Sequence, residues 1–255
     1  MTAPPPDVVV RSDAEALART VAEELVGRLV AAQATHGGAS VVLTGGGVGT
    51  AVLEQVAALD REGGTGIDWS AVDVWWGDER FVPADDDDRN EKGARRALLD
   101  TVGVPADRVH AMPASDAGFA EPEEAAAWYA RELASAAPAG RDLPRFDVLL
   151  LGIGAEGHTA SIFPASPAVQ DQRPVVAVRD CPKPPPTRVS LGFSAINSAE
   201  EVWLVVAGAE KAPGVARALA GADPVELPAA GVHGRQGTRW WVDAAAAAQV
   251  AGPDA

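Results

Sequence analysis

Apolar side chains recur at every fourth position in the first part of the chain, the period of a helix with one buried face. The residues that carry this period are Leu17, Val21, Leu25 and Leu29. Ser12 and Glu15 precede them with the spacing of a capping box, and Gly37 follows them. The pattern predicts a long amphipathic helix that starts at Ser12 and stops at the glycine.

Beyond this helix, short apolar runs alternate with segments of helical period. The runs that predict buried strands are 40–43, 71–76, 146–151, 175–178, 188–191, 202–206 and 239–242. The segments that predict helices are 50–59, 91–99, 122–137 and 211–220, and an alanine run over 244–248 predicts a terminal helix. Alternation of this kind is typical of an α/β fold, in which helices cover a mostly parallel sheet.

No internal repeat and no linker-like stretch divides the 255 residues. A chain of this length can form one α/β domain, so we expect a single domain over residues 1–255 with short flexible termini. Hydrophobic residues make up 47% and charged residues 22% of the chain. These fractions are close to globular averages, and they favour a folded enzyme or binding domain over a disordered chain.

The formal net charge of −15 bears on the choice of partner. Nucleic acids and anionic membranes are usually bound by clustered Lys and Arg, so we expect neither as a partner. The only cysteine, Cys181, excludes an intramolecular disulfide and a cysteine-based metal site. The first residues lack the features of a signal peptide, and no apolar run could span a bilayer, so we expect the cytoplasm.

In an open parallel sheet, ligands bind beyond the carboxyl ends of the strands, and three segments fall there. The first, 44–47, contains Gly45, Gly46 and Gly47 between a predicted strand and a predicted helix. Bare backbone at a helix start can approach a phosphate and donate N–H groups to it. A tight turn that is merely rich in glycine explains the same pattern equally well.

The second segment, 77–80, carries Asp78, Glu79 and Arg80 directly after a strand. A guanidinium there can bind phosphate with two hydrogen bonds, and a carboxylate can orient a hydroxyl or a histidine. A solvated surface ion pair is the simpler alternative. The acidic run 85–88 lacks the spacing and glycine of a calcium loop, so we interpret it as a polar loop and expect no metal.

The third segment, 152–161, contains a G-x-G-x-x-G pattern typical of dinucleotide sites. Pro164 and Pro167 follow too soon for the crossover helix that such a site needs. His158 lies in this glycine-rich loop beside Glu156, and an imidazole with a pKa near ~6.5 can take a proton from water. A histidine bonded only to backbone is the alternative. Ser161 lacks the G-x-S-x-G elbow of serine hydrolases.

Four stretches resemble the 6-phosphogluconolactonase family, in this order: L-T-G-G-G over 43–47, W-G-D-E-R-F-V-P over 76–83, L-L-G-I-G-A-E-G-H-T-A-S-I-F-P over 150–164 and P-P-T-R-V-S over 185–190. The resemblance spans most of the chain, and the third stretch is highly specific. It implies a Rossmann-like, mostly parallel sheet flanked by helices, the NagB/RpiA-like fold that glucosamine-6-phosphate deaminases share. It also implies hydrolysis of 6-phosphoglucono-δ-lactone in the pentose phosphate pathway, without a cofactor.

The resemblance implies roles for individual residues. His158 matches the general base, with Glu156 or Asp78 as the carboxylate that steadies it. The residues expected to hold phosphate or other substrate oxygens are Gly45, Gly46, Gly47, Arg80, Arg188 and Lys211. The chain departs from the family at two places: Glu156 stands where Asp is usual, and the loop after Pro83 retains only Asn90 of the usual residues.

Two other functions remain as alternatives. An aldose–ketose isomerase with deamination, as in glucosamine-6-phosphate deaminase, would be expected to carry a carboxylate where Phe163 stands. A sugar-phosphate-sensing domain would normally carry a helix-turn-helix and a basic face. A catalytically silent binder is a further form of this second alternative, because fold does not fix function. For the lactonase we expect a monomer whose partner is the small sugar-phosphate lactone.

Overall fold

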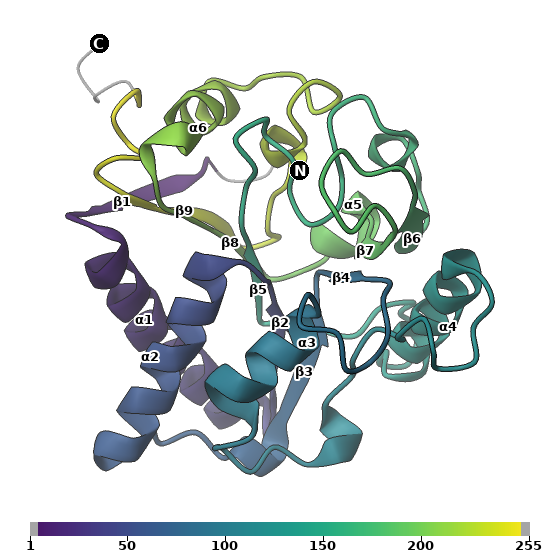
Figure 1. Cartoon of the computed structure of the whole chain (residues 1–255). Coiled ribbons are helices and arrows are strands. Elements are labelled where there is room, and N and C mark those ends of the chain that lie inside the picture. Colours follow the sequence, from purple (N-terminus) through teal and green to yellow (C-terminus); the bar gives the residue numbers. More distant parts are fainter. Residues whose placement is uncertain (1–4, 251–255) are drawn as a thin grey trace.

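A computed structural model describes residues 5–250, and its main sheet has six parallel strands (Figure 1). In order across the sheet they are β1 (Asp7–Arg11), β9 (Gly237–Asp243), β8 (Glu201–Val206), β5 (Val148–Leu151), β2 (Ala39–Leu43) and β3 (Val72–Trp76). Every pairing between them is parallel, which confirms the predicted α/β class. The termini expected to be short and flexible lie outside the described residues.

Two long helices pack against each other beside this sheet, α1 (Ala14–His36) and α2 (Gly47–Gly63) (Figure 1). The predicted cap of α1 is wrong by one residue. Asp13, and not Ser12, accepts a hydrogen bond from the Ala16 N–H, at 2.9 Å, while the Ser12 hydroxyl donates to the Asp13 carboxylate. The helix ends at Gly37 in the left-handed region, as the sequence predicted.

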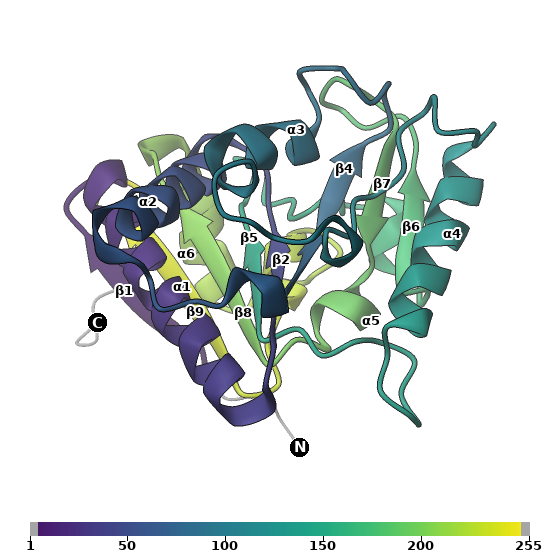
Figure 2. The ribbon, with the colours of Figure 1, turned by 90° about the horizontal axis from the view of Figure 1, so that it is seen from below.

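A second sheet of three antiparallel strands stands beside the first: β4 (Asp78–Arg80), β7 (Arg188–Leu191) and β6 (Val175–Val178). The sequence predicted two of these strands but did not separate them from the parallel sheet, and it left 78–80 as a loop. Gly77 joins the sheets, because its N–H donates to Leu43 of β2 and its carbonyl accepts from Leu191 of β7. Helix α4 (Pro122–Ser135) covers β6 and β7 (Figure 2).

The remaining helices are short. They are α3 (Asn90–Ala94), which continues as a π-helical turn over Arg95–Leu99, then α5 (Phe193–Ile196) and α6 (Ala212–Leu219). Single 3-10 turns occupy Trp69–Ala71, Ala106–Arg108, Pro167–Val169, Ala209–Lys211 and Pro228–Gly231.

The terminal helix predicted over 244–248 is wrong, because these residues form turns. The Asp243 carboxylate accepts hydrogen bonds from the Ala246 N–H, at 2.7 Å, and from the Gly208 N–H. A run of five alanines is too short to pay the cost of helix nucleation without packing partners. The side chain of Asp243 therefore fixes the local backbone.

The core lies on both faces of the main sheet and includes the fully buried side chains of Trp75, Trp76, Trp203 and Trp241. Strands β2, β3, β5 and β8 end at the same edge of the sheet, since all four are parallel. Among residues 5–250, none of the helices combines the length and the apolar character needed to cross a bilayer.

Candidate active site

A cavity of about 660 Å³ opens at the carboxyl edge of the main sheet. Its walls come from the segments that follow β2, β3, β5 and β8, and from β7. The predicted site residues that line it are Gly45, Gly46, Gly47, Asp78, Arg80, His158, Arg188 and Lys211. Glu156 does not line the cavity and reaches it only through His158.

His158 is held from two sides. Its Nδ1 lies 2.9 Å from Oε1 of Glu156, and its ring stacks on Phe163 with 4.4 Å between the ring centroids. An ionised carboxylate only accepts hydrogen bonds, so Nδ1 carries the ring proton and Nε2 is left as the basic nitrogen. The sequence left Glu156 and Asp78 open as the supporting carboxylate, and the structure places Glu156 on the imidazole.

Burial favours the neutral form of the imidazole. Burial lowers the pKa of His158 below its usual 6.5, the positive charge of Lys183 lowers it further, and Glu156 and Asp78 act in the opposite direction. Burial raises the pKa of Glu156, but a backbone hydrogen bond, Lys183 and His158 outweigh it and bring the pKa to about 2. At neutral pH the site therefore pairs an uncharged imidazole with an ionised carboxylate.

Asp78 has a different place from the one first expected. Its buried carboxylate accepts a hydrogen bond from the Ser161 hydroxyl at 2.6 Å, and its other oxygen lies 3.4 Å from the Asn90 side-chain amide. Nη1 of Arg188 lies 3.9 Å from Oδ2 of Asp78, the oxygen that accepts from Ser161. Asp78 thus joins β4 to the loop after β5, and none of its hydrogen bonds reaches His158.

The glycine loop places the start of α2 against the cavity. The loop turns at Gly46, whose φ is +85°, and α2 begins at Gly47, three residues earlier than the sequence predicted. A Cβ on Gly45 would overlap the side-chain amide of Asn90. The N-terminus of α2, where the first N–H groups have no partner within the helix, therefore faces the cavity.

The basic residues differ in how far their donors are already used. Nη1 of Arg80 donates to the carbonyl of Asp88, whereas its buried Nε has no partner among the described residues. Lys211 has its ammonium 3.9 Å from Glu210. Arg188 is 5% exposed, and its Nε and Nη2 donate to the carbonyls of 183, 184 and 185, while its Nη1 lies in the cavity wall near the Asp78 carboxylate.

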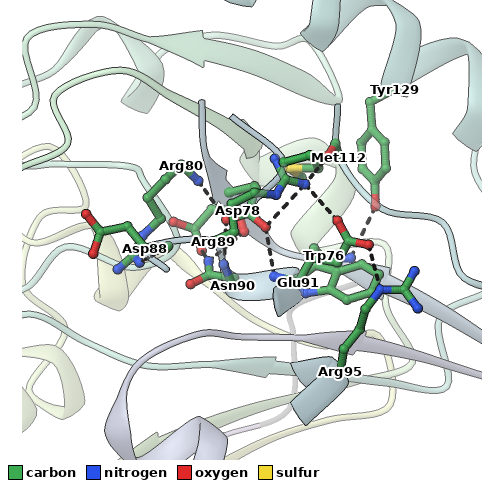
Figure 3. Close-up of polar contacts among 12 residues, drawn as sticks. Trp76, Asp78, Arg80, Asp88, Arg89, Asn90, Glu91, Arg95, Met112 and Tyr129 are labelled. Atoms are coloured by element: carbon green, nitrogen blue, oxygen red, sulfur yellow. Dashed lines mark hydrogen bonds and ion pairs between the residues drawn. The ribbon is translucent and has the colours of Figure 1, made fainter. Parts of the chain in front are cut away.

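Glu79, between the two predicted site residues of β4, is structural. It is 1% exposed, and its carboxylate accepts the backbone N–H groups of Arg80, Asn90 and Glu91 at 2.7 to 2.9 Å. Burial raises the pKa of Glu79, while Arg89 and these N–H groups oppose the rise. Figure 3 shows Arg89 bonded to Glu91 and to the carbonyl of Met112, so the acidic loop is anchored at its end.

Sequence reasoning missed Lys183 and Phe163 as neighbours of the base. Lys183 follows Pro182 in the proline-rich stretch from which only Arg188 was selected, and it bonds Glu156 at 3.0 Å. Phe163 was considered only for the carboxylate that it replaces. Among residues 5–250, no group of three or more His, Cys, Asp and Glu side chains is arranged to hold a metal ion.

Residues 12–241 match the family model described as glucosamine-6-phosphate isomerases/6-phosphogluconolactonase. The chain is 51% identical to the 6-phosphogluconolactonase of Mycobacterium tuberculosis over 240 residues, 93% of this chain and 96% of that protein. It is 49% identical to that of Streptomyces coelicolor, over 96% of this chain and 95% of that one. The structure of the Trypanosoma brucei 6-phosphogluconolactonase has a TM-score of 0.81 and 29% identity, covering 98% of this chain and 100% of that one.

Proposed function

The chain belongs to the glucosamine-6-phosphate isomerase/6-phosphogluconolactonase family, and from this membership we infer that it hydrolyses 6-phosphoglucono-δ-lactone to 6-phosphogluconate in the oxidative pentose phosphate pathway. One observation carries the assignment of its base. His158, whose Nδ1 lies 2.9 Å from Glu156, lines a cavity that Arg80, Arg188 and Lys211 also line. A neutral imidazole facing a site for an anion suits the hydrolysis of a phosphorylated lactone.

Substrate binding begins with the phosphate in this proposal. The N–H groups of Gly45 to Gly47, together with Arg80, Arg188 and Lys211, bind the phosphate oxygens and bring the lactone carbonyl to His158. Binding energy from the phosphate, which does not react, thereby orients the reacting carbon. The cavity, at about 660 Å³, has room for the sugar ring and the attacking water.

The chemical step uses His158 as general base and then as general acid. Nε2 takes a proton from water as the water oxygen attacks the carbonyl carbon, which gives a tetrahedral intermediate and an imidazolium. The intermediate collapses, the bond from the carbonyl carbon to the ring oxygen breaks, and the imidazolium returns the proton to that oxygen. Glu156 stabilises the imidazolium, a cation or N–H group of the cavity stabilises the oxyanion, and no cofactor enters.

Two alternatives are less well supported. For a deaminase–isomerase, the chain has Phe163 where a carboxylate would be expected, and this phenyl ring is stacked on His158. The solved deaminase that shares the fold is 19% identical and supports the fold alone. For a silent sugar-phosphate binder, the ordered pair of Glu156 and His158 would have no task, since a binding site needs no base.

The test follows freshly prepared 6-phosphoglucono-δ-lactone by coupling its hydrolysis to the oxidation of 6-phosphogluconate. We expect the wild type to accelerate hydrolysis and His158→Ala to lower kcat by roughly 100- to 10,000-fold, the range for a general base. His233→Ala, at an exposed histidine outside the cavity, is the matched control. A wild type that adds nothing to the spontaneous rate excludes the lactonase. A fully active His158→Ala variant excludes His158 as the general base.

We further propose one lactonase domain that acts as a monomer in the cytoplasm. The support is that the residues of one chain complete the cavity. Light scattering should give a mass near 26.1 kDa, and urea should unfold the protein in one transition. A dimer, two separate transitions or a fluorescent fusion found outside the cytoplasm would each overturn the corresponding part.

A further inference from the structure

Lys183 does not line the cavity, yet only one carboxylate separates it from the base. Its Nζ lies 3.0 Å from Oε2 of Glu156, while Oε1 of the same carboxylate lies 2.9 Å from Nδ1 of His158. We propose that Lys183 is a positioning residue for the hydrolysis, which fixes Glu156 and through it the imidazole of His158. The inference rests on the proposed function, because it takes His158 as the base.

The segment that carries Lys183 is itself held in place. It joins β6 to β7, and Arg188 at the start of β7 folds back on it. Nη2 of Arg188 donates to the carbonyl oxygens of Lys183 and Pro184, and Nε donates to that of Pro185 at 2.7 Å. Because this guanidinium is buried, it fixes the backbone from which the lysine reaches Glu156. The antiparallel sheet thereby contributes to the order of a loop that belongs to the parallel sheet.

The ion pair between Lys183 and Glu156 contributes little to the stability of the fold. The side chain of Lys183 is 45% exposed and that of Glu156 is 34% exposed, and pairs this open to water contribute little to folding. What the pair does fix is the direction of the carboxylate. Without Lys183, Oε2 of Glu156 would lose its charged partner, and the carboxylate, still beside Nδ1 of His158, would hold the imidazole in a less fixed orientation.

Lys183 also balances the charge of Glu156 at the imidazole. Glu156 raises the pKa of His158 and Lys183 lowers it. Of the other charged groups, Asp78 on β4 raises the pKa, and the cavity is also lined by Arg80, Arg188, Lys211 and Glu210. Removal of Lys183 leaves the carboxylate unopposed, so His158 stays protonated, and inactive as a base, up to a higher pH.

The experiment measures kcat and KM from pH 5 to 9 and follows the His158 imidazole by NMR in wild type and Lys183→Met. We expect the acid limb of kcat/KM and the NMR titration of His158 to move up together by about half a unit to one unit. At neutral pH, kcat should fall by about tenfold with KM nearly unchanged. Lys183→Arg should return both the His158 titration and kcat to wild-type values. Lys92→Met removes a lysine paired with Asp87 at 2.9 Å, outside the cavity, and should behave as wild type.

Glu156→Gln should move the pH midpoint of the His158 titration in the opposite direction from Lys183→Met. The midpoint followed by NMR should fall to lower pH. Lys183→Met added to Glu156→Gln should change kcat little, because no carboxylate remains for the lysine to fix. If Lys183→Met does not fold, Lys183→Gln takes its place with the same readouts. An unchanged His158 titration and kcat, or a raised KM alone, overturns the proposal. A wild type without lactonase activity overturns the proposed function, and the NMR titration then reports separately on the Lys183–His158 coupling.

Discussion

Gly154 lies directly beneath the side chain of His158, so closely that a Cβ at this glycine would overlap Nδ1 and would approach Oε2 of Glu156 to 2.5 Å. The backbone closes the same loop, since the Gly154 N–H donates to the His158 carbonyl at 2.9 Å. The second glycine of the G-x-G-x-x-G pattern is therefore required by the histidine–carboxylate pair. This gives the pattern a physical reason that involves no dinucleotide.

Gly154→Ala should displace the imidazole and its carboxylate together. We expect kcat to fall by roughly 100-fold, the loss typical of a misplaced general base, while KM changes little because the phosphate ligands are untouched. Gly27→Ala is the control, because a Cβ there would meet nothing within 4 Å and alanine suits the interior of α1 better than glycine does. A Gly154→Ala enzyme with wild-type kcat would show that the close approach does not matter.

The pH dependence should reflect the lowered pKa of His158. Burial, the largest cause, disfavours the charged ring, so the neutral base persists below pH 6.5 and is lost as the pH falls further through the lowered pKa. We expect the acid limb of kcat/KM to have its midpoint below pH 6.5. The unfolding free energy should decrease over the same acid range, because the unfolded chain takes up the proton more readily. An acid limb at or above 6.5 in the wild type would contradict this.

The edge of the sheet that carries the site could be predicted because apolar runs locate the strands and glycines mark the loops after them. Strand β4 could not, since Asp78, Glu79 and Arg80 carry no apolar signal. Glu79 and Asp78 are buried nonetheless, because backbone N–H groups and the Ser161 hydroxyl satisfy their carboxylates and β7 pairs with their backbone. A polar segment that is buried through hydrogen bonds has the hydropathy of a loop.

Contacts between residues far apart in the chain also could not be predicted from the sequence. Glu156 and Lys183 are 27 positions apart and lie on different loops, so no local period links them. The alanines of 244–248 have high helix propensity, yet the contacts of Asp243 determine the local structure. Both cases show tertiary contacts overriding local preference.

Substrate affinity should depend on the cations of the cavity. Lys211 lines the cavity, and its ammonium lies 3.9 Å from the carboxylate of Glu210, too far for a hydrogen bond, so its charge is available to a phosphate. Lys211→Met should raise KM by about 10- to 100-fold and lower kcat less, since the interaction is made in both ground and transition states. Arg217→Met removes a cation whose pair with Glu226 is exposed, and should leave KM unchanged. An unaltered KM in Lys211→Met would remove this residue from the phosphate site.

Glu79 should be the residue of β4 on which folding depends most. Glu79→Ala would leave the backbone N–H groups of Arg80, Asn90 and Glu91 without their acceptor. It would also remove one of the two carboxylates near the buried Arg89, whose other partner is Glu91. We expect a loss of roughly 2–4 kcal/mol in the free energy of unfolding, measured by urea denaturation. Glu79→Gln retains one carbonyl acceptor and should lose less.

Glu23→Ala, at an exposed position on α1, provides the reference and should change the unfolding free energy by less than about 0.5 kcal/mol. The order of the three variants matters more than any single value. If Glu79→Ala unfolds at the same urea concentration as Glu23→Ala, the buried carboxylate does not anchor the loop. The rigidity of that loop, and with it the placement of Asn90 against the glycine turn, would then have to come from the packing of α3 on α2.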